Sequence, residues 1–453
     1  MSDKGRQQTY RSSRTSKLRG TIFVPGDKSI SHRALILGSL GIGQTTISGL
    51  LESDDIRATI RALRTLGIDI TKTHDKQWIL HGVGTGGLRE SNSVLDLGNS
   101  GTGVRLLIGL VSSHPMRTFF TGDCSLSARP MGRIIEPLER MGAQFISRYD
   151  GCLPLVVMGC DDPIPITYRL LVPSAQVKSA IMMAGLSVPG ITTVSESVAT
   201  RDHTERLYRH FGIPITIQSS KENNKSSDQT TFISIVGRSG FMGQDVRIPG
   251  DISSAAFVIV GSLICPETDV VIRDVGMNPG RIGLLETLAE MGADLDFKNH
   301  RDLCGEPIAD IHVSSSTLKG VYVGPERAPR MIDEYPILGI AAAYAEGVTT
   351  LTGLSELRVK ESDRLSSLAR GLKACGVQVV ESNDSLTIYG KGGSVLGNGL
   401  IKVGMDHRIA MSFLVLGMRS HKPVLVDDVS MIETSFPGFI GLMNDLGACI
   451  DRR

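Results

Sequence analysis

Polar and charged side chains gather at six places along the chain where a long apolar segment begins. The backbone N–H groups at the start of a helix have no partner inside the helix, and the helix dipole is positive there, so such a start can receive an anion. Ser, Asp and Asn are also ordinary N-cap residues, and any one cluster alone is more simply explained as a cap. The clusters are Lys28, Ser29, Ser31 and Arg33; Asn99, Ser100, Gly101, Thr102 and Arg105; Ser174, Gln176 and Lys178; Asp251, Ser253 and Ser254; Asp333 and Glu334; and Asp406, His407 and Arg408.

Arginines at or near these positions favour a bound ligand over simple capping. A guanidinium group carries a planar fork of donors that matches phosphate and carboxylate, and several such groups close to helix starts need anionic partners. Pairing with Asp or Glu at the surface is the alternative. We therefore expect anionic substrates near Arg33, Arg105, Arg129, Arg364 and Arg408.

Motifs for metals and nucleotides are absent from the sequence or fail in their context. There is no HExxH, and His203, His210 and His407 lack partners at metal-ligand spacing. The segment 38–45 (GSLGIGQT) resembles a phosphate-binding loop, but Gln44 stands where the lysine is required. We predict neither a metal nor an organic cofactor.

The elements that must position these residues repeat six times. Each polar cluster opens a segment that is apolar nearly all round, which predicts a buried helix. An amphipathic segment follows and ends at a glycine suited to a helix C-terminus, and this pattern recurs roughly every 75 residues. Strand-like stretches such as RTFFTG and TFISIVG separate the helices, so we predict an α/β fold of six units. The glycines are Gly67, Gly142, Gly212, Gly292, Gly376 and Gly447.

We predict that the six units form two lobes of three units each. A polar, weakly patterned stretch, 219–231, ends the third unit, and we expect the chain to cross back near Arg247. The lobes would then be 1–26 with 247–453, and 27–246, with a disordered basic tail at 1–14. If the units of each lobe pack side by side, the buried helices would point their N-termini into a cleft between the lobes. A continuous ring or solenoid of six units is the alternative.

Composition excludes several classes of protein. The 453 residues are 41% hydrophobic and 21% charged, which is typical of globular proteins and not of disordered ones. A formal net charge of +1 provides no field for nonspecific nucleic-acid binding. The longest apolar run, 255–265, is too short to span a membrane, and the seven cysteines show no disulfide or zinc spacing. We expect a cytoplasmic monomer with no nucleic-acid or membrane partner.

Long ordered motifs show a resemblance to a known family. PGDKSISHRALILGSL, LGNSGTGVRLL, GDCSLSARPMGRI, PSAQVKSAIMMAGL, TRDHTE, DEYPILGIAAA, LRVKESDRL and DHRIAMSF together resemble the 5-enolpyruvylshikimate-3-phosphate synthase family almost end to end. The resemblance implies two lobes, each of three βαβαββ units. It also implies transfer of the enolpyruvyl group of phosphoenolpyruvate to the 5-hydroxyl of shikimate 3-phosphate, with release of phosphate, in the biosynthesis of chorismate and the aromatic amino acids.

The resemblance also implies a role for individual residues. Asp333 would be the base that takes the proton of the 5-hydroxyl, and Glu361, aided by Lys28, would protonate the methylene carbon. The residues implied for phosphoenolpyruvate are Lys28, Gly101, Arg129, Gln176, Arg364 and Arg408. Those implied for shikimate 3-phosphate are Ser29, Arg33, Ser174, Ala175, Gln176, Arg201 and Lys360.

Two features keep alternatives open. Cys124 lies five residues before Arg129, much as the catalytic cysteine does in the sister family of UDP-N-acetylglucosamine enolpyruvyl transferases, although the other motifs favour a small, half-buried loop residue. Thr434 stands before Ser435 where many synthases have a cationic residue, which leaves one phosphoenolpyruvate contact without a candidate. A non-catalytic anion-binding protein built from the same repeats is a third possibility, but carboxylates beside the cations argue against it.

Overall fold

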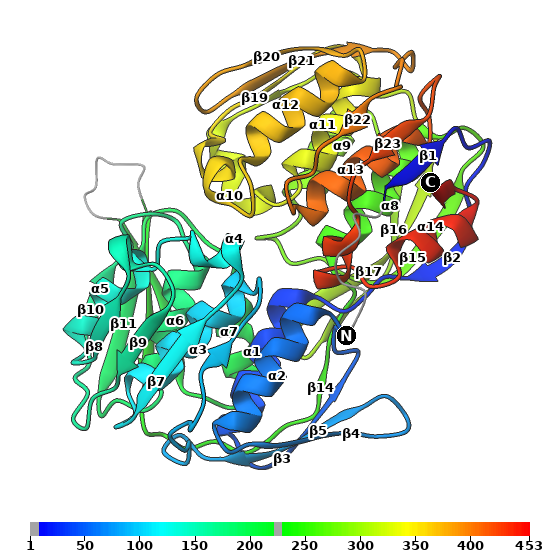
Figure 1. Cartoon of the computed structure of the whole chain (residues 1–453). Helices are drawn as coiled ribbons and strands as arrows, with labels where there is room; N and C mark the ends of the chain where they lie inside the picture. Colours follow the sequence, from blue (N-terminus) through cyan, green and yellow to red (C-terminus); the bar gives the residue numbers. More distant parts are fainter. Residues whose placement is uncertain (1–8, 222–228) are drawn as a thin grey trace. The chain divides into compact units, whose positions relative to one another are not determined.

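The computed structural model describes residues 9–221 and 229–453, which form two compact units. Unit 1 consists of the chain up to Pro25 together with Pro249–Arg301 and Pro307–Arg453, and unit 2 consists of Gly26–Ile248 with Asp302–Glu306. The elements of each unit can be followed by colour and label in Figure 1. Within the described residues, no helix combines the length and the apolar character that a membrane span requires.

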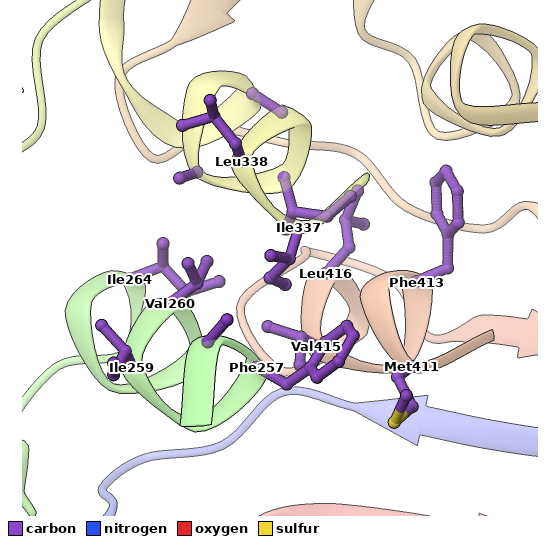
Figure 2. Packing of buried hydrophobic residues seen from close by; sticks show 14 of the residues in the cluster. Phe257, Ile259, Val260, Ile264, Ile337, Leu338, Met411, Phe413, Val415 and Leu416 are labelled. Atoms are coloured by element: carbon purple, nitrogen blue, oxygen red, sulfur yellow. The ribbon is translucent and has the colours of Figure 1, made fainter. Parts of the chain in front are cut away.

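In the described part of the chain, each unit has three buried helices, as the segments that are apolar nearly all round predicted. Their apolar side chains form one core per unit. Figure 2 shows how Phe257 and Val260 of α8, Ile337 of α11 and Leu416 of α13 meet in the core of unit 1. The helices are α1 (Lys28–Leu40), α3 (Gly101–Ser112) and α6 (Ala175–Gly185) in unit 2, and α8 (Ile252–Ile264), α11 (Tyr335–Tyr344) and α13 (His407–Gly417) in unit 1.

The amphipathic segments form the second set of helices. Each of the six predicted glycines follows one of them with a positive φ, between 71° and 116°, a conformation that glycine adopts without strain. These helices are α2 (Asp54–Thr65), α5 (Gly132–Arg140), α7 (His203–His210), α9 (Gly283–Glu290), α12 (Arg364–Ala374) and α14 (Phe439–Leu446). Short helices complete the set: α4 (Cys124–Ser127), α10 (Ala328–Met331), η1 (Tyr149–Gly151), η2 (Pro325–Arg327), η3 (Ser355–Val359) and η4 (Ser430–Thr434).

The strands of residues 9–221 and 229–453 form six sheets of four strands, three in each unit. In unit 2 the strands, in sheet order, are β14 (Val246–Arg247), β3 (Ile42–Ser48), β5 (Trp78–Val83) and β4 (Asp69–Lys72); β6 (Leu95–Asp96), β7 (Arg117–Thr121), β9 (Leu155–Met158) and β8 (Gln144–Ser147); and β10 (Thr167–Arg169), β11 (Ile191–Glu196), β13 (Gln229–Val236) and β12 (Ile215–Lys221). In unit 1 they are β16 (Leu295–Leu303), β17 (Glu306–Ser314), β15 (Asp269–Gly276) and β2 (Arg19–Phe23); β18 (Tyr322–Val323), β19 (Glu346–Leu351), β21 (Leu386–Lys391) and β20 (Gln378–Glu381); and β22 (Leu400–Ile401), β23 (Val424–Val426), β1 (Tyr10–Ser13) and β24 (Cys449–Arg452).

All six sheets contain the same parallel pair. The strand that follows each buried helix pairs in parallel with a short strand. In one sheet, Thr167 lies opposite Thr193 across such a parallel pair. Antiparallel pairs, such as β3 with β5, extend the sheets. Two sheets take their parallel strand from elsewhere in the chain. The strand β2, which precedes α1, joins the sheet that follows α8, and β14, which precedes α8, joins the sheet that follows α1. The two-lobed fold of six βαβαββ units is thus confirmed, with two strands, β2 and β14, exchanged between two of the units.

The prediction of a disordered tail over 1–14 is wrong for Tyr10–Ser13. These residues form β1, which lies between β23 and β24 in the sixth sheet, and Figure 1 shows the blue strand beside the orange one. Tyr10 lies opposite both Val426 and Arg452. The sixth repeat ends before its last strand, and the N-terminal strand satisfies the backbone groups that would otherwise form an open edge. Residues 1–8 lie outside the described part of the chain.

Candidate functional site

In unit 2, the predicted lysine lies at the start of a capped helix. Asp27 accepts a hydrogen bond from the backbone N–H of Ile30 at 2.9 Å and caps α1. Lys28, the next residue, places its Nζ 2.9 Å from Oδ2 of Asp55 in the first turn of α2. Asp55 was not among the predicted site residues, because an acidic residue in a first turn is commonly explained by the helix dipole alone.

Arg33 is buried and hydrogen-bonds to neutral oxygens. Its Nε donates to Oγ1 of Thr204 at 2.7 Å, its Nη1 to the carbonyl of Ser29 at 2.9 Å, and its Nη2 to Oγ of Ser179 at 2.8 Å. Burial lowers the pKa of Arg33 to about 10. The group is still cationic at neutral pH, and an anion nearby would stabilise that charge.

Two arginines meet at the N-terminus of α3. Ser100 caps the helix, and Arg129 donates from Nη2 to Oδ1 of Asn99 at 2.9 Å. A Cβ atom on Gly101 would lie 2.8 Å from Nη1 of Arg129 and 3.0 Å from Nη1 of Arg105. The absence of a side chain at Gly101 therefore allows both guanidinium groups to reach the free end of the helix.

Gln176 connects the first turn of α6 to the same helix end. Its Nε2 donates to Oγ1 of Thr102 at 3.0 Å. Ser174 caps α6 by accepting from the backbone N–H of Val177, and Ala175 is the first residue of that helix. Gly101, Arg129, Ser174, Ala175 and Gln176, which the sequence predicted as substrate contacts, thus belong to the starts of two helices or to their immediate neighbours.

A buried histidine ties three helices of unit 2 together. Nδ1 of His32 lies 2.9 Å from Oγ1 of Thr59 on α2, and Nε2 lies 3.4 Å from Oγ of Ser100. His32 is fully buried, and burial, followed by the charges of Lys28 and Arg33, lowers its pKa well below the ordinary value of 6.5. The imidazole is therefore neutral in the folded protein, where it spaces the starts of α1 and α3.

This histidine predicts a loss of stability in acid. Because the unfolded state binds a proton on His32 near pH 6.5 and the folded state does not, the stabilising contribution is complete above pH 6.5 and is lost as the pH falls toward the lowered pKa. In His32→Gln, the free energy of unfolding should fall less steeply between pH 7 and 5, by up to about 1.4 kcal/mol per pH unit. Urea unfolding of both proteins across that range measures the difference, and parallel curves would contradict it.

In unit 1, a buried arginine holds three carboxylates. Arg364, the first residue of α12, has 1% of its surface exposed. Its Nη1 lies 3.3 Å from Oδ1 of Asp333, its Nε donates to Oδ2 of Asp406 at 2.8 Å, and its Nη2 pairs with Glu361. Burial alone would lower the pKa of Arg364, but Asp406, Glu361 and Asp333 raise it above its usual value. The two carboxylates predicted to exchange protons with substrate therefore share one cation.

The second predicted arginine of unit 1 lies beside this group. Nη1 of Arg408, in the first turn of α13, donates to the backbone carbonyl of Asp333 at 3.1 Å and lies 3.8 Å from Oε1 of Glu334. Asp406 accepts from the backbone N–H of Arg408 at 2.9 Å, so it caps α13 and pairs with Arg364 at the same time. The structure thus brings Asp333, Glu361, Arg364 and Arg408 together within unit 1.

The remaining predicted residues lie at the borders of these groups. Lys360 is half-buried at the bend that follows η3, and Arg201 is half-buried two residues before α7 begins. Cys124 is exposed at the first position of the four-residue helix α4. Thr434 is buried, and its hydroxyl donates to the carbonyl of Met431 at 2.7 Å, within the same 3₁₀-helix.

The described residues contain no cluster of three or more His, Cys, Asp or Glu side chains that could hold a metal ion.

Comparison with known proteins gives consistent results along the whole chain. The family model "EPSP synthase (3-phosphoshikimate 1-carboxyvinyltransferase)" matches residues 13–443. Relatives named 3-phosphoshikimate 1-carboxyvinyltransferase include those of Paramagnetospirillum magneticum, 54% identical, and Rhodospirillum rubrum, 51% identical, each with 97% of both chains covered. The solved structure of EPSP synthase from Acinetobacter baumannii is 42% identical with a TM-score of 0.85, and covers 98% of this chain and 100% of its own. The enolpyruvyl transferase NikO from Streptomyces tendae, at 16% identity and a TM-score of 0.75 over 99% of both chains, shares the fold.

Proposed function

This chain belongs to the EPSP synthase family, and from that premise we propose how its residues transfer the enolpyruvyl group of phosphoenolpyruvate to the 5-hydroxyl of shikimate 3-phosphate, a step of the shikimate pathway. The protein is an enolpyruvyl transferase, so neither the sister activity with a catalytic Cys124 nor a silent anion-binding protein is supported. The two units are proposed as the lobes predicted from sequence. A monomeric state and a cytoplasmic location stay predictions.

One observation carries the assignment of the acid and base. Both proposed carboxylates, Asp333 and Glu361, pair with the buried guanidinium of Arg364. Asp333 would take the proton of the attacking 5-hydroxyl, and Glu361 would deliver a proton to the methylene carbon of phosphoenolpyruvate. The 5-oxygen would bond to C2 of phosphoenolpyruvate and give a tetrahedral adduct. This adduct would then lose phosphate by cleavage of its C–O bond and one proton from its methyl group, which restores the C=C bond. The carboxylate of Glu361, left without its proton by the first step, would take that proton. A cation shared by both groups supports this assignment because it fixes the positions of the two carboxylates relative to each other.

The anionic groups of the substrates need cations and helix starts, which unit 2 provides. We assign Lys28, Arg129 and Gln176 to the binding of phosphoenolpyruvate, together with Gly101, whose lack of a side chain leaves room beside Arg129. Arg364 and Arg408 of unit 1 are assigned to the same substrate. Arg33 is assigned to shikimate 3-phosphate because it is a buried cation whose hydrogen bonds go to neutral oxygens. The other residues proposed for that substrate are Ser29, Ser174, Ala175, Gln176, Arg201 and Lys360.

Phosphate release tests the proposed function. The purified protein should release phosphate only when both phosphoenolpyruvate and shikimate 3-phosphate are present, and Glu361→Gln should lower the rate by about 10²-fold or more, because an amide cannot donate the proton. Glu290→Gln is the matched control, since it removes a surface carboxylate that pairs with Arg327. Release with UDP-N-acetylglucosamine in place of shikimate 3-phosphate would instead support the sister activity.

Gly101→Ala should selectively weaken phosphoenolpyruvate binding. The new methyl group would meet Nη1 of Arg129 at 2.8 Å and Nη1 of Arg105 at 3.0 Å, and both are ends of flexible side chains that can move. The fold should therefore survive, while the displaced cations raise the KM for phosphoenolpyruvate roughly tenfold. Steady-state kinetics with each substrate varied in turn measures this. An unchanged KM would show that Arg129 need not occupy its present position.

A further inference from the structure

A second buried carboxylate lies beside the proposed base. Glu334 directly follows Asp333 and has 1% of its surface exposed. Its Oε1 accepts a hydrogen bond from Oγ of Ser253, in the first turn of α8, and lies 3.8 Å from Nη1 of Arg408. Within the described residues, its other oxygen, Oε2, is buried without a hydrogen-bond partner.

Helix capping does not explain this side chain. Glu334 occupies the position before α11, yet it makes no side-chain hydrogen bond to the start of that helix. A buried carboxylate with an unsatisfied oxygen costs free energy, and removal of the charge would be the simplest way to avoid that cost. Its position 3.8 Å from Nη1 of Arg408 therefore points to a role for its charge.

Glu334 is held in place from the side of α8. Ser253 donates to Glu334 and in turn accepts from Nη2 of Arg281 at 2.6 Å. Arg281 is buried and also lies 3.2 Å from Oδ1 of Asp251, the residue that caps α8. The carboxylate of Glu334 thus has a fixed position, and the oxygen that accepts from Ser253 is the one that lies 3.8 Å from Nη1 of Arg408.

We propose that Glu334 is a positioning residue that orients the guanidinium of Arg408 for phosphoenolpyruvate. This inference rests on the proposed function, which assigns Arg408 to that substrate. Both contacts of Arg408 within this group, to Glu334 and to the carbonyl of Asp333, are made by Nη1. Because the guanidinium is planar, two contacts at one nitrogen fix the direction of Nε and Nη2, which remain available as donors to an anion.

The neutral side chain in Glu334→Gln would release this constraint. Arg408 could then turn toward the carboxylates that surround Arg364, and fewer of its donors would be presented to the substrate. We expect the KM for phosphoenolpyruvate to rise about tenfold, which corresponds to the loss of one charge-assisted contact. The KM for shikimate 3-phosphate and kcat should each change less than about threefold, since a residue that acts through Arg408 affects the binding of one substrate.

A double-mutant cycle separates positioning from general damage. Arg408→Lys keeps the charge but loses the planar fork, so it should raise the KM for phosphoenolpyruvate by itself. Adding Glu334→Gln to Arg408→Lys should raise it by less than about twofold further, because the residue that Glu334 orients is already gone. Independent, multiplying effects would overturn the proposal.

Two further variants keep the test decisive. Ser253→Ala removes the support of Glu334 without removing its charge, and should also raise the KM for phosphoenolpyruvate; if Glu334→Gln does not fold, an unchanged KM in Ser253→Ala overturns the proposal. Glu306→Gln is the control, since Glu306 is a buried carboxylate of unit 2 that lies 2.6 Å from Nδ1 of His203. It should leave the KM for phosphoenolpyruvate unchanged.

The test also distinguishes this inference from the proposed function. A wild-type protein that releases no phosphate would contradict the proposed function. An active wild type together with an unchanged KM for phosphoenolpyruvate in Glu334→Gln would contradict this inference alone.

Discussion

Asp333→Asn is expected to lower kcat by about 10³-fold with little effect on the fold. An asparagine has nearly the same size, and its amide oxygen can still face Nη1 of Arg364, which lies 3.3 Å from Oδ1 of Asp333. It cannot take a proton from the 5-hydroxyl, so the transfer step loses its base. Steady-state phosphate release measures kcat, and a thermal melt tests the fold.

The comparison with Asp269→Asn makes this result specific. Asp269 is a surface carboxylate beside His312, and its replacement should leave kcat within about twofold of wild type, as is usual for exposed positions. If Asp333→Asn keeps more than about a tenth of the activity, Asp333 is not the base, because a general base contributes at least 10²-fold. The base would then have to be sought among the other two carboxylates that pair with Arg364, Glu361 and Asp406.

Lys178→Met is expected to destabilise unit 2 by about 3–5 kcal/mol. Lys178 is fully buried on α6, with its Nζ 2.6 Å from Oε1 of Glu205 and 3.2 Å from Oε2 of Glu196. The substitution leaves both carboxylates buried without their cation, which costs more than the ion pairs themselves contribute. Urea unfolding measures the loss of free energy.

The loss should depend on pH in a defined direction. Burial raises the pKa of Glu205 even with Lys178 present, and without that cation the carboxyl will take up a proton more readily. A raised pKa gives stability that is present at low pH and lost as the pH rises, so the variant should be less impaired at pH 5 than at pH 8. Lys178→Met combined with Glu205→Gln should recover part of the loss. Equal losses of unfolding free energy at pH 5 and pH 8 would show that Glu205 does not take up a proton in the Lys178→Met variant.

Local patterns in the sequence predicted most of the fold. The helices α1 and α8 are apolar nearly all round after their polar first turns, and a helix of that kind is stable only in a core, so their burial followed from composition. Gly67 and Gly447 marked helix ends because only glycine adopts a positive φ there without strain. Apolar segments and terminal glycines can be recognised within one or two turns of helix. Because both recur in every repeat, six units could be counted from the sequence.

The candidate site was predicted largely through the family's motifs, and only the tertiary structure supplied the partners. Asp333 and Arg364 lie at the starts of two different helices of one repeat, and Asp406 belongs to the next repeat, so no local spacing relates the three residues. Asp55 and Glu334 resemble ordinary acids at helix starts until their cations are known. Which charges pair in a core depends on which helix starts become neighbours in the fold, and no short stretch of sequence shows this.

The sequence by itself determined the repeated unit, its buried and amphipathic helices and the types of residue available for anion binding. The tertiary structure decided which strands complete each sheet, since β1 and β2 pair with segments hundreds of residues away. It also decided which carboxylates share the guanidinium of Arg364. The physical reason is the same in both cases: helix periodicity and caps are satisfied by near neighbours in sequence, whereas sheet edges and buried charges are satisfied by whichever distant groups the folded chain brings to them.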